Sequence, residues 1–180
     1  QAKHLFDHLK SIGENVHLFR EPGGTEFGEQ IRSILLKEKM NELAKFFLFQ
    51  AARAELYEKM QKIKDEDSSA IFILDRSFIC SIAYQGQHLV ENQISNMIYI
   101  TPFKQVHHPD LIFFLDPPIE VCIKRCKNRN EDEDPKKLFE IRNTYNNFLR
   151  RTGYNLVHIE DEDEAAVKEI IVKKVMEITK

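Results

Sequence analysis

The sequence lacks three features that would each indicate a different class of protein. Its 26 basic and 29 acidic residues leave a net charge of -3, so there is no excess of positive charge to hold a nucleic-acid backbone or an anionic membrane surface. The longest apolar runs, such as 71–74 and 111–115, are too short to cross a bilayer. No signal-peptide pattern opens the chain. We therefore expect a cytoplasmic protein whose partners are neither nucleic acid nor membrane.

Cysteine is also scarce. The three cysteines, Cys80, Cys122 and Cys126, are an odd number, and no second pair completes a zinc site although Cys122 and Cys126 share a helical face. A reduced, intracellular protein is the simplest interpretation. The 180 residues, 42% of them hydrophobic, suffice for one domain with a substantial core. Since no repeat or low-complexity linker divides the chain, we expect a single domain over residues 1–180.

Helix and strand patterns alternate along the chain. The runs with strand length are 16–19, 71–75, 111–116 and 156–159. Helical spacing covers 2–12, 27–35, 41–63, 78–106 with a break near Gly86, 117–127, 136–151 and 165–178. Continuous apolar strands suit a sheet that is covered on both faces. The pattern therefore predicts an α/β fold, a doubly wound parallel sheet with helices on both faces, and a mobile acidic loop over 131–134.

Charged and turn-forming residues follow three of these strands, at 20–24, 75–76 and 116–118. In open parallel sheets, ligands bind at the carboxyl ends of the strands. Each segment taken alone is as well explained by an ordinary turn. Together they would line one rim of the sheet, and this rim is the predicted site.

Several motifs in this region occur in a recognisable order. Residues 20–25 read Arg-Glu-Pro-Gly-Gly-Thr, 28–32 read Gly-Glu-Gln-Ile-Arg, and 49–53 read Phe-Gln-Ala-Ala-Arg. Asp-Arg-Ser-Phe at 75–78 and Ala-Tyr-Gln-Gly at 83–86 follow. In this order the motifs resemble those of bacterial thymidylate kinases, and the resemblance covers essentially the whole chain. It implies the fold of P-loop nucleoside monophosphate kinases and a homodimer.

The activity that the resemblance implies is the magnesium-dependent transfer of the ATP γ-phosphoryl group to dTMP, which gives dTDP and ADP in dTTP synthesis. Two alternatives stay open. One is a related P-loop kinase that acts on a deoxynucleoside or on another nucleoside monophosphate. The other is a nucleotide-binding pseudoenzyme without activity, against which the intact base and phosphate residues speak.

Phe49 and Arg53 lie at i and i+4 and so share one helix face. Phe49 is suited to stack on a pyrimidine, which is worth about 1–3 kcal/mol, while Arg53 donates to the base carbonyls. Cytosine has an amino donor where thymine has an acceptor, so Arg53 should reject it. The thymine methyl adds only about 0.8 kcal/mol, so discrimination against uracil should be modest. With thirteen phenylalanines in the chain, Phe49 has the alternative of a core position.

Two arginines are suited to clamp the dTMP phosphate by charge-assisted hydrogen bonds. Arg76 stands at a strand end, and Arg32 lies on the helix after the glycine loop. The resemblance implies the same role for both. Asp75 either holds Mg2+, directly or through water, or orients Arg76.

The resemblance assigns four more residues to the substrate. Tyr84 would pack under the sugar where a ribose 2′-hydroxyl would sit, and Ser81 would approach the base. Glu21 and Pro22 belong to the glycine-loop signature of the dTMP site. For Tyr84 and Ser81, plain packing is the alternative.

Residues 124–135 resemble the lid that closes over the nucleotide phosphates. Arg125 and Arg129 are the candidates to bind ATP and to stabilise the charge of the transferring phosphoryl group. The sequence Asn-Arg-Asn-Glu at 128–131 differs from the family's usual Asp-Arg-aromatic-Glu. A solvated helix face is the alternative for both arginines.

Thymidylate kinases open with a strand and a phosphate loop of the form Gly-x-x-x-x-Gly-Lys-Ser/Thr. Here Gln1-Ala2-Lys3 resembles the residues that follow that loop, and no lysine follows Gly23-Gly24. We expect the chain to lack that strand and loop. Three consecutive apolar side chains, Phe46, Phe47 and Leu48, are suited to a dimer face or to the core.

Overall fold

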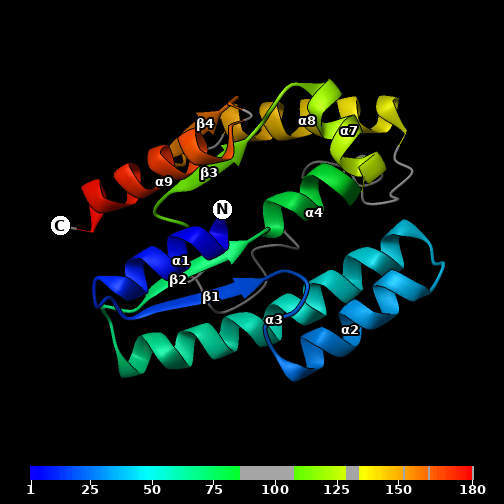
Figure 1. Ribbon diagram of the computed structural model, residues 1–180. Helices are drawn as coiled ribbons and strands as arrows, with labels where there is room; N and C mark the ends of the chain where they lie inside the picture. The colour runs from blue at the N-terminus through cyan, green and yellow to red at the C-terminus, as the bar shows by residue number, and fades with distance from the viewer. Residues whose placement is uncertain (86–107, 129–133, 152, 162, 180) are drawn as a thin grey trace. The chain divides into compact units, whose positions relative to one another are not determined.

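The structure is a computed structural model that describes residues 1–85, 108–128, 134–151, 153–161 and 163–179 (Figure 1). Contacts between residues divide the chain into two compact units. The N-terminal unit comprises Ala2 and residues 6–108, and the C-terminal unit comprises Gln1, residues 3–5 and residues 109–180. Each unit is described by itself.

The described helices and strands follow the alternation that the sequence predicts. In chain order they are α1 (Ala2–Ser11), β1 (Val16–Arg20), α2 (Glu26–Lys37), α3 (Glu42–Glu66), β2 (Ile71–Asp75), α4 (Phe78–Gln85), β3 (Ile112–Leu115), α7 (Ile119–Asn128), α8 (Pro135–Arg151), β4 (Leu156–Ile159) and α9 (Glu164–Ile178).

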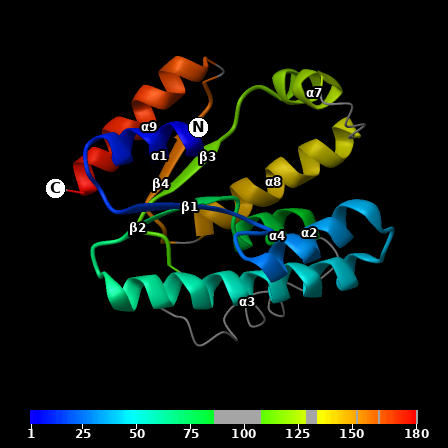
Figure 2. The ribbon, with the colours of Figure 1, turned by 60° about the horizontal axis from the view of Figure 1, so that its bottom comes forward.

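In the N-terminal unit, β1 and β2 form a parallel pair whose register runs from Val16 opposite Ile71 to Arg20 opposite Asp75. Helix α3 covers one face of this pair, and the second half of α1 lies on the other side (Figures 1 and 2). Under α3 the core gathers Phe19, Leu56, Tyr57 and Met60, with Phe72 and Leu74 packed against it. This packing fixes α3 over the sheet and sets the position of every side chain that α3 contributes to the site.

Helix α2 packs on α3 in the same unit. It begins at Thr25, whose hydroxyl accepts a hydrogen bond from the Gly28 amide at 2.9 Å, as an N-cap threonine does. Helix α3 begins in the same way at Asn41, whose side chain accepts from the Ala44 amide at 2.8 Å. The glycine loop therefore leads directly from β1 into a capped helix.

In the C-terminal unit, β3 and β4 form a second parallel pair, with Ile112 opposite Leu156 and Leu115 opposite Ile159. Figure 2 shows α8 and α9 on opposite sides of this pair. Helix α9 is capped by Asp163, which accepts from the amides of Ala165 and Ala166 at 2.9 Å. Helices α7 and α8 contact each other.

The predicted α/β class with parallel strands is confirmed, and the segments 71–75 and 156–159 are strands with the predicted bounds. Among the described strands, hydrogen bonds form the pairs β1-β2 and β3-β4 and do not join one pair to the other, so one doubly wound sheet remains a prediction. The predicted helical spacing beyond Gln85 and most of the acidic loop lie outside the described residues. No helix among the described residues is long and apolar enough to span a membrane.

Candidate functional site

A buried ion pair stands at the end of β1. Glu21 is the first residue after the strand, and its amide extends the ladder by donating to the Asp75 carbonyl at 3.0 Å. Its Oε2 lies 2.7 Å from both Nε and Nη2 of Arg53, on α3. Glu21 is 5% exposed and Arg53 is 3% exposed. Because removing either charge would leave the other buried and unpaired, the two side chains hold each other in place.

Arg53 also joins α3 to α4. Its Nη2 donates to the Ser81 hydroxyl at 3.0 Å, and its Nη1 donates to the side-chain carbonyl of Gln50. Burial, the largest effect, lowers the pKa of Arg53, but the charge of Glu21, the nearby Tyr57 and Cys80 and the hydrogen bond to Glu21 together outweigh it, and the pKa is raised. The guanidinium is therefore a permanent, fixed donor at the carboxyl end of the strand.

Two buried acceptors, one in this network and one on the helix that carries Ser81, have no hydrogen-bond partner among the described residues. They are Oε1 of Glu21 and Oε1 of Gln85. Gln85 is 7% exposed and follows Ser81 by one turn of α4, so both project from one face. Buried acceptors are nearly always paired. Sequence analysis missed Gln85, although its i, i+4 spacing from Ser81 was a signal that could have found it.

The glycine loop is held by Glu29. One carboxylate oxygen accepts from Arg20 Nη2 at 2.8 Å, and the other accepts from the Gly24 amide at 3.2 Å. The hydrogen bond from Arg20 is the largest cause that lowers the pKa of Glu29. A Cβ on Gly23 would lie 2.5 Å from Glu29 Oε1, and the Gly23 φ of 137° also favours glycine.

Arg32 and Pro22 are brought together beside this loop. Arg32 lies one turn after Glu29 on α2, and its Nη1 donates to the Pro22 carbonyl at 3.3 Å. The arginine is partly exposed, so its charge can reach a ligand at the loop. This position agrees with the predicted phosphate role without testing it.

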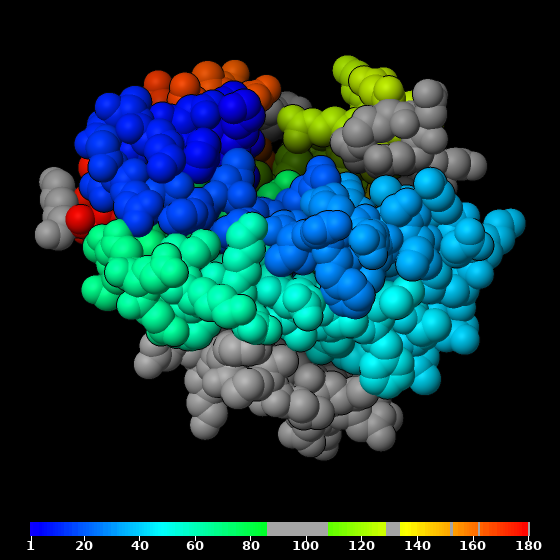
Figure 3. All heavy atoms as spheres, turned by 90° about the horizontal axis from the view of Figure 1, so that it is seen from below, coloured from blue at the N-terminus to red at the C-terminus, as the bar shows by residue number. Residues whose placement is uncertain are grey.

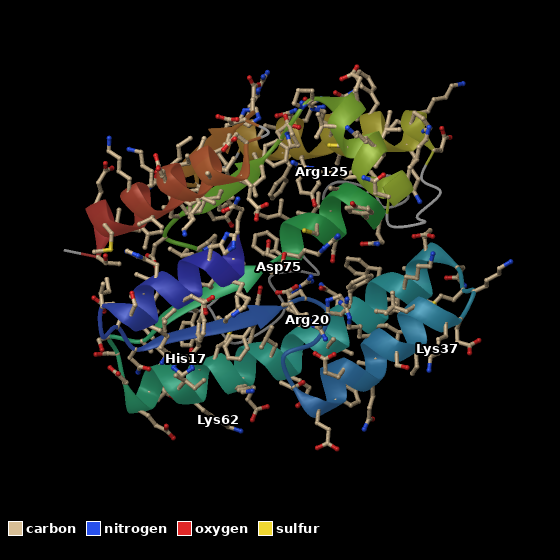
Figure 4. The ribbon with its side chains drawn as sticks, in the orientation of Figure 1. His17, Arg20, Lys37, Lys62, Asp75 and Arg125 are labelled. Carbon is tan, nitrogen blue, oxygen red and sulfur yellow. The ribbon has the colours of Figure 1, made fainter. Side chains whose placement is uncertain are left out.

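Arg76 and Tyr84 are also brought together. Arg76 has a φ of 69°, an uncommon conformation for a residue other than glycine, and its guanidinium lies 5.8 Å from the centre of the Tyr84 ring. Asp75, just before it, is exposed at the end of β2 opposite Arg20 in the register, and Figure 4 labels both residues at the strand ends. The Asp-Arg motif thus lies at the same edge as Glu21.

Other predicted residues are not linked to this cluster by a described contact. Phe49 is partly buried on α3, one turn before Arg53. Arg125 is exposed on α7 in the C-terminal unit, where Figure 4 labels it. Arg129 lies outside the described residues. The structure therefore joins Glu21, Arg53 and Ser81 directly, and it tests no role in binding.

Comparison with known proteins shows the family of this chain. A sequence model of the family described as Thymidylate kinase matches residues 1–170. The chain belongs to the thymidylate kinase family. It is 37% identical over 155 residues to the thymidylate kinase of Thermosipho africanus, covering 81% of this chain and 75% of that protein. It is 31% identical over 191 residues to the thymidylate kinase of Acinetobacter baylyi, covering 96% and 88%.

Asp75 is the predicted ligand for the Mg2+ ion of the kinase reaction. Its exposed carboxylate at a strand end offers the hard oxygen ligand that Mg2+ prefers. Among the described residues, a cluster of possible metal ligands occurs at Asp116, His158 and Glu160, whose ligand atoms lie within 4.8 Å of one another. There, however, Arg142 Nε lies 2.7 Å from Asp116 Oδ1 and already neutralises the buried carboxylate. The chemistry of the donors therefore favours Asp75.

Proposed function

We propose that this thymidylate kinase binds the pyrimidine of dTMP at the cluster formed by Glu21, Arg53, Ser81 and Gln85, with Phe49 against the ring. Its family and its relatives make it an ATP-dependent dTMP kinase. The observations that carry the proposed site are the fixed, fully buried Arg53 charge and the two buried oxygens, Glu21 Oε1 and Gln85 Oε1, that have no hydrogen-bond partner among the described residues. Such an arrangement is suited to a ligand with both acceptors and a donor on one edge.

Thymine has that edge. The described partners of Arg53 bind its Nε, its Nη2 and one side of its Nη1, which leaves one N–H of its five donors for a base carbonyl. Gln85 Oε1 is suited to accept from the ring N3–H. Cytosine has an acceptor at N3 and a donor at the amino group, so both contacts would be mispaired. Each unpaired buried group costs about 1–3 kcal/mol, and dCMP should bind more weakly than dTMP.

For the phosphate of dTMP, we propose Arg76 and Arg32, with Pro22 beside them. Their support is geometric, since both belong to the loop edge where β1 and β2 end. Charge-assisted hydrogen bonds from guanidinium groups are strong and directional. The unusual φ of Arg76 is the kind of local strain that occurs at ligand sites. Tyr84, which lies against this guanidinium, would limit the space beneath the sugar.

The reaction that we propose has no covalent enzyme intermediate. A dTMP phosphate oxygen attacks the γ-phosphorus of ATP, the bond from the γ-phosphorus to the bridging oxygen breaks, and ADP leaves. Catalysis then consists of positioning and charge stabilisation. Arg76 would hold the attacking phosphate, while Arg125 and Arg129 of the lid at 124–135 would bind the ATP phosphates. Mg2+, for which Asp75 is the proposed ligand, would neutralise charge on them.

The finer points of architecture are proposals as well. We propose one kinase domain over residues 1–180 with the doubly wound sheet of P-loop nucleoside monophosphate kinases, acting in the cytoplasm as a homodimer.

Phe46 is buried in the core at 1% exposure, so it cannot serve a dimer face, whereas Phe47 is 50% exposed. Other exposed apolar side chains on α2 and the start of α3 are Phe27, Ile34, Leu36 and Leu43. Figure 3 looks onto these two helices.

The test is formation of dTDP from ATP and dTMP by the full chain with Mg2+, with dUMP and dCMP as competing acceptors. We expect dTMP to be preferred strongly over dCMP and only modestly over dUMP. Phe49→Ala and Arg53→Lys should each lower kcat/KM for dTMP. A preference for dCMP, or for an unphosphorylated nucleoside, would show that the chain has one of the alternative kinase activities.

A further inference from the structure

A second carboxylate is buried at a strand end, in the C-terminal unit. Asp116 follows β3 directly and is 7% exposed, and its amide extends the ladder by donating to the Ile159 carbonyl at 2.8 Å. Both carboxylate oxygens are paired. Oδ1 lies 2.7 Å from Arg142 Nε, and Oδ2 lies 3.0 Å from His158 Nε2. Each oxygen of Asp116 therefore has a partner, whereas Oε1 of Glu21 has none among the described residues.

Arg142 does more than neutralise this charge. Its Nη2 also donates to the backbone carbonyls of Asp116 and Pro117 at 3.3 and 3.4 Å. These carbonyls belong to the turn that leads from β3 into α7. The guanidinium therefore binds a side chain and the backbone of the same turn, which a lysine ammonium cannot reproduce because it lacks the planar fork.

The first turn of α7 starts from this point. The amides of Val121 and Cys122 donate to the Pro118 carbonyl at 3.0 and 3.2 Å, and the Cys122 thiol approaches the Pro117 carbonyl at 3.8 Å. Arg142 itself is held by α8, whose buried residues are Ile141 and Leu149. One arginine thus ties the start of α7 to the middle of α8, and residues 129–134 connect the two helices in the sequence.

We propose that Arg142 and Asp116 are positioning residues for the ATP side of the reaction. They fix the turn at Asp116 and Pro117, and this turn sets the direction of α7 and the position of Arg125 on its last turn. The inference rests on the proposed function, which assigns Arg125 to the ATP phosphates. A helix that is free to swing at its first turn would misplace that guanidinium, and small displacements of positioning groups cost about a hundredfold in rate.

The experiment compares Arg142→Met and Arg142→Lys with the matched control Arg150→Met, an exposed arginine on the same helix, in the full chain. Arg142→Met should lower kcat/KM for ATP by about tenfold to a hundredfold while the dissociation constant for dTMP stays unchanged. Arg142→Lys keeps the charge and should give an intermediate loss. Amide hydrogen exchange in residues 119–128 should accelerate in Arg142→Met and stay at the wild-type rate in Arg150→Met.

Two results would overturn the proposal. In a folded Arg142→Met protein, ATP kinetics and α7 exchange equal to those of Arg150→Met would show that the pair positions nothing. Equal losses for ATP and dTMP would show a general structural role. If the wild-type chain formed no dTDP, the proposed function would fail separately, and the exchange rates of α7 would still decide whether Arg142 fixes the helix.

Discussion

Two arginine-carboxylate pairs occupy equivalent places in the two units of this thymidylate kinase. Glu21 and Asp116 are each the first residue after a strand, each extends a parallel ladder through its amide, and each pairs with an arginine from a helix. The surroundings differ. Both oxygens of Asp116 have partners, whereas Glu21 Oε1 and the neighbouring Gln85 Oε1 have none among the described residues.

This difference, more than charge or burial alone, is the basis for proposing a ligand site at Glu21 and a structural anchor at Asp116. Arg53 is buried, and Oε1 of Glu21 and Oε1 of Gln85 are buried acceptors without a partner among the described residues, which favours a site that receives a ligand. Arg142 has a 25% exposed side chain and binds backbone carbonyls of its own turn. A satisfied pair of this kind holds local structure.

The largest expected effect comes from breaking each pair. Arg53→Met leaves the Glu21 charge buried, so we expect the free energy of unfolding to fall by about 3–5 kcal/mol. Arg142→Met should cost only about 1–3 kcal/mol, because Asp116 keeps His158 and the arginine is partly exposed. Urea denaturation of both variants measures the difference. Equal losses would remove the distinction between the two pairs.

The next prediction concerns ligand binding, with Asp116→Asn as the matched control for Glu21→Gln. Glu21→Gln keeps the shape but weakens the hold on Arg53, so dTMP affinity should fall by about tenfold or more, as expected for loss of a hydrogen bond to a charged group. Asp116→Asn should leave dTMP affinity at the wild-type value. Calorimetric titration with dTMP tests both. If Asp116→Asn weakened dTMP as much as Glu21→Gln, the dTMP site would not be confined to the first cluster.

Two proposed ligand contacts, those of Phe49 and Arg76, would sharpen the comparison further. Phe49→Ala should weaken dTMP by about tenfold, since stacking on an aromatic ring is worth about 1–3 kcal/mol. Arg76→Ala should weaken dTMP far more than thymidine, which has no phosphate. Fluorescence or calorimetric titration with both ligands separates the base contact from the phosphate contact. Equal losses of dTMP and thymidine in Arg76→Ala would indicate that this arginine is structural.

The smallest effect belongs to the exposed pair of Arg20 and Glu29. The hydrogen bond from Arg20 lowers the pKa of Glu29 below its usual 4.5. The ionised Glu29 therefore stabilises the folded protein fully above pH 4.5, and this stabilisation is lost as the pH falls through the lowered pKa. Glu29→Gln should therefore lower the free energy of unfolding by less than about 1 kcal/mol near neutral pH, because the pair is exposed. In strong acid the substitution should leave the free energy of unfolding unchanged. Thermal melting from pH 2 to 7 beside Glu140→Gln, an exposed control, measures this. A Glu29→Gln deficit that grew in acid would contradict the assigned sign.

Local patterns predicted much of the fold. The strands at 71–75 and 156–159 have the predicted bounds, and α3 carries Phe49 and Arg53 one turn apart. Two adjacent residues of a helix point about 100° apart, which is why Phe46 is buried while Phe47 is half exposed. The sequence pattern groups the two residues because it does not say which of them faces the interior.

The pairing of charges could not be read from local patterns. Glu21 and Arg53 were both predicted to contact the substrate, but they are 32 residues apart and their mutual hydrogen bond follows from how α3 packs on β1. Asp116 was predicted only as a rim residue, because His158, 42 residues away, and Arg142 complete it through tertiary packing. The spacing of Gln85 from Ser81 places both on one helix face, but the burial of Gln85 depends on tertiary packing.

The central claim is that Arg53 and the unpaired buried oxygen of Gln85 bind the edge of thymine. Calorimetric titration of dTMP and dCMP into the wild type and into Gln85→Leu tests it most directly. We predict that the wild type prefers dTMP over dCMP by about tenfold or more, which is the effect of one mispaired buried hydrogen bond. Gln85→Leu keeps the Arg53 contact and should lose a measurable part of this preference while it stays folded. Equal binding of dTMP and dCMP by the wild type, or an unchanged preference in Gln85→Leu, would contradict the account.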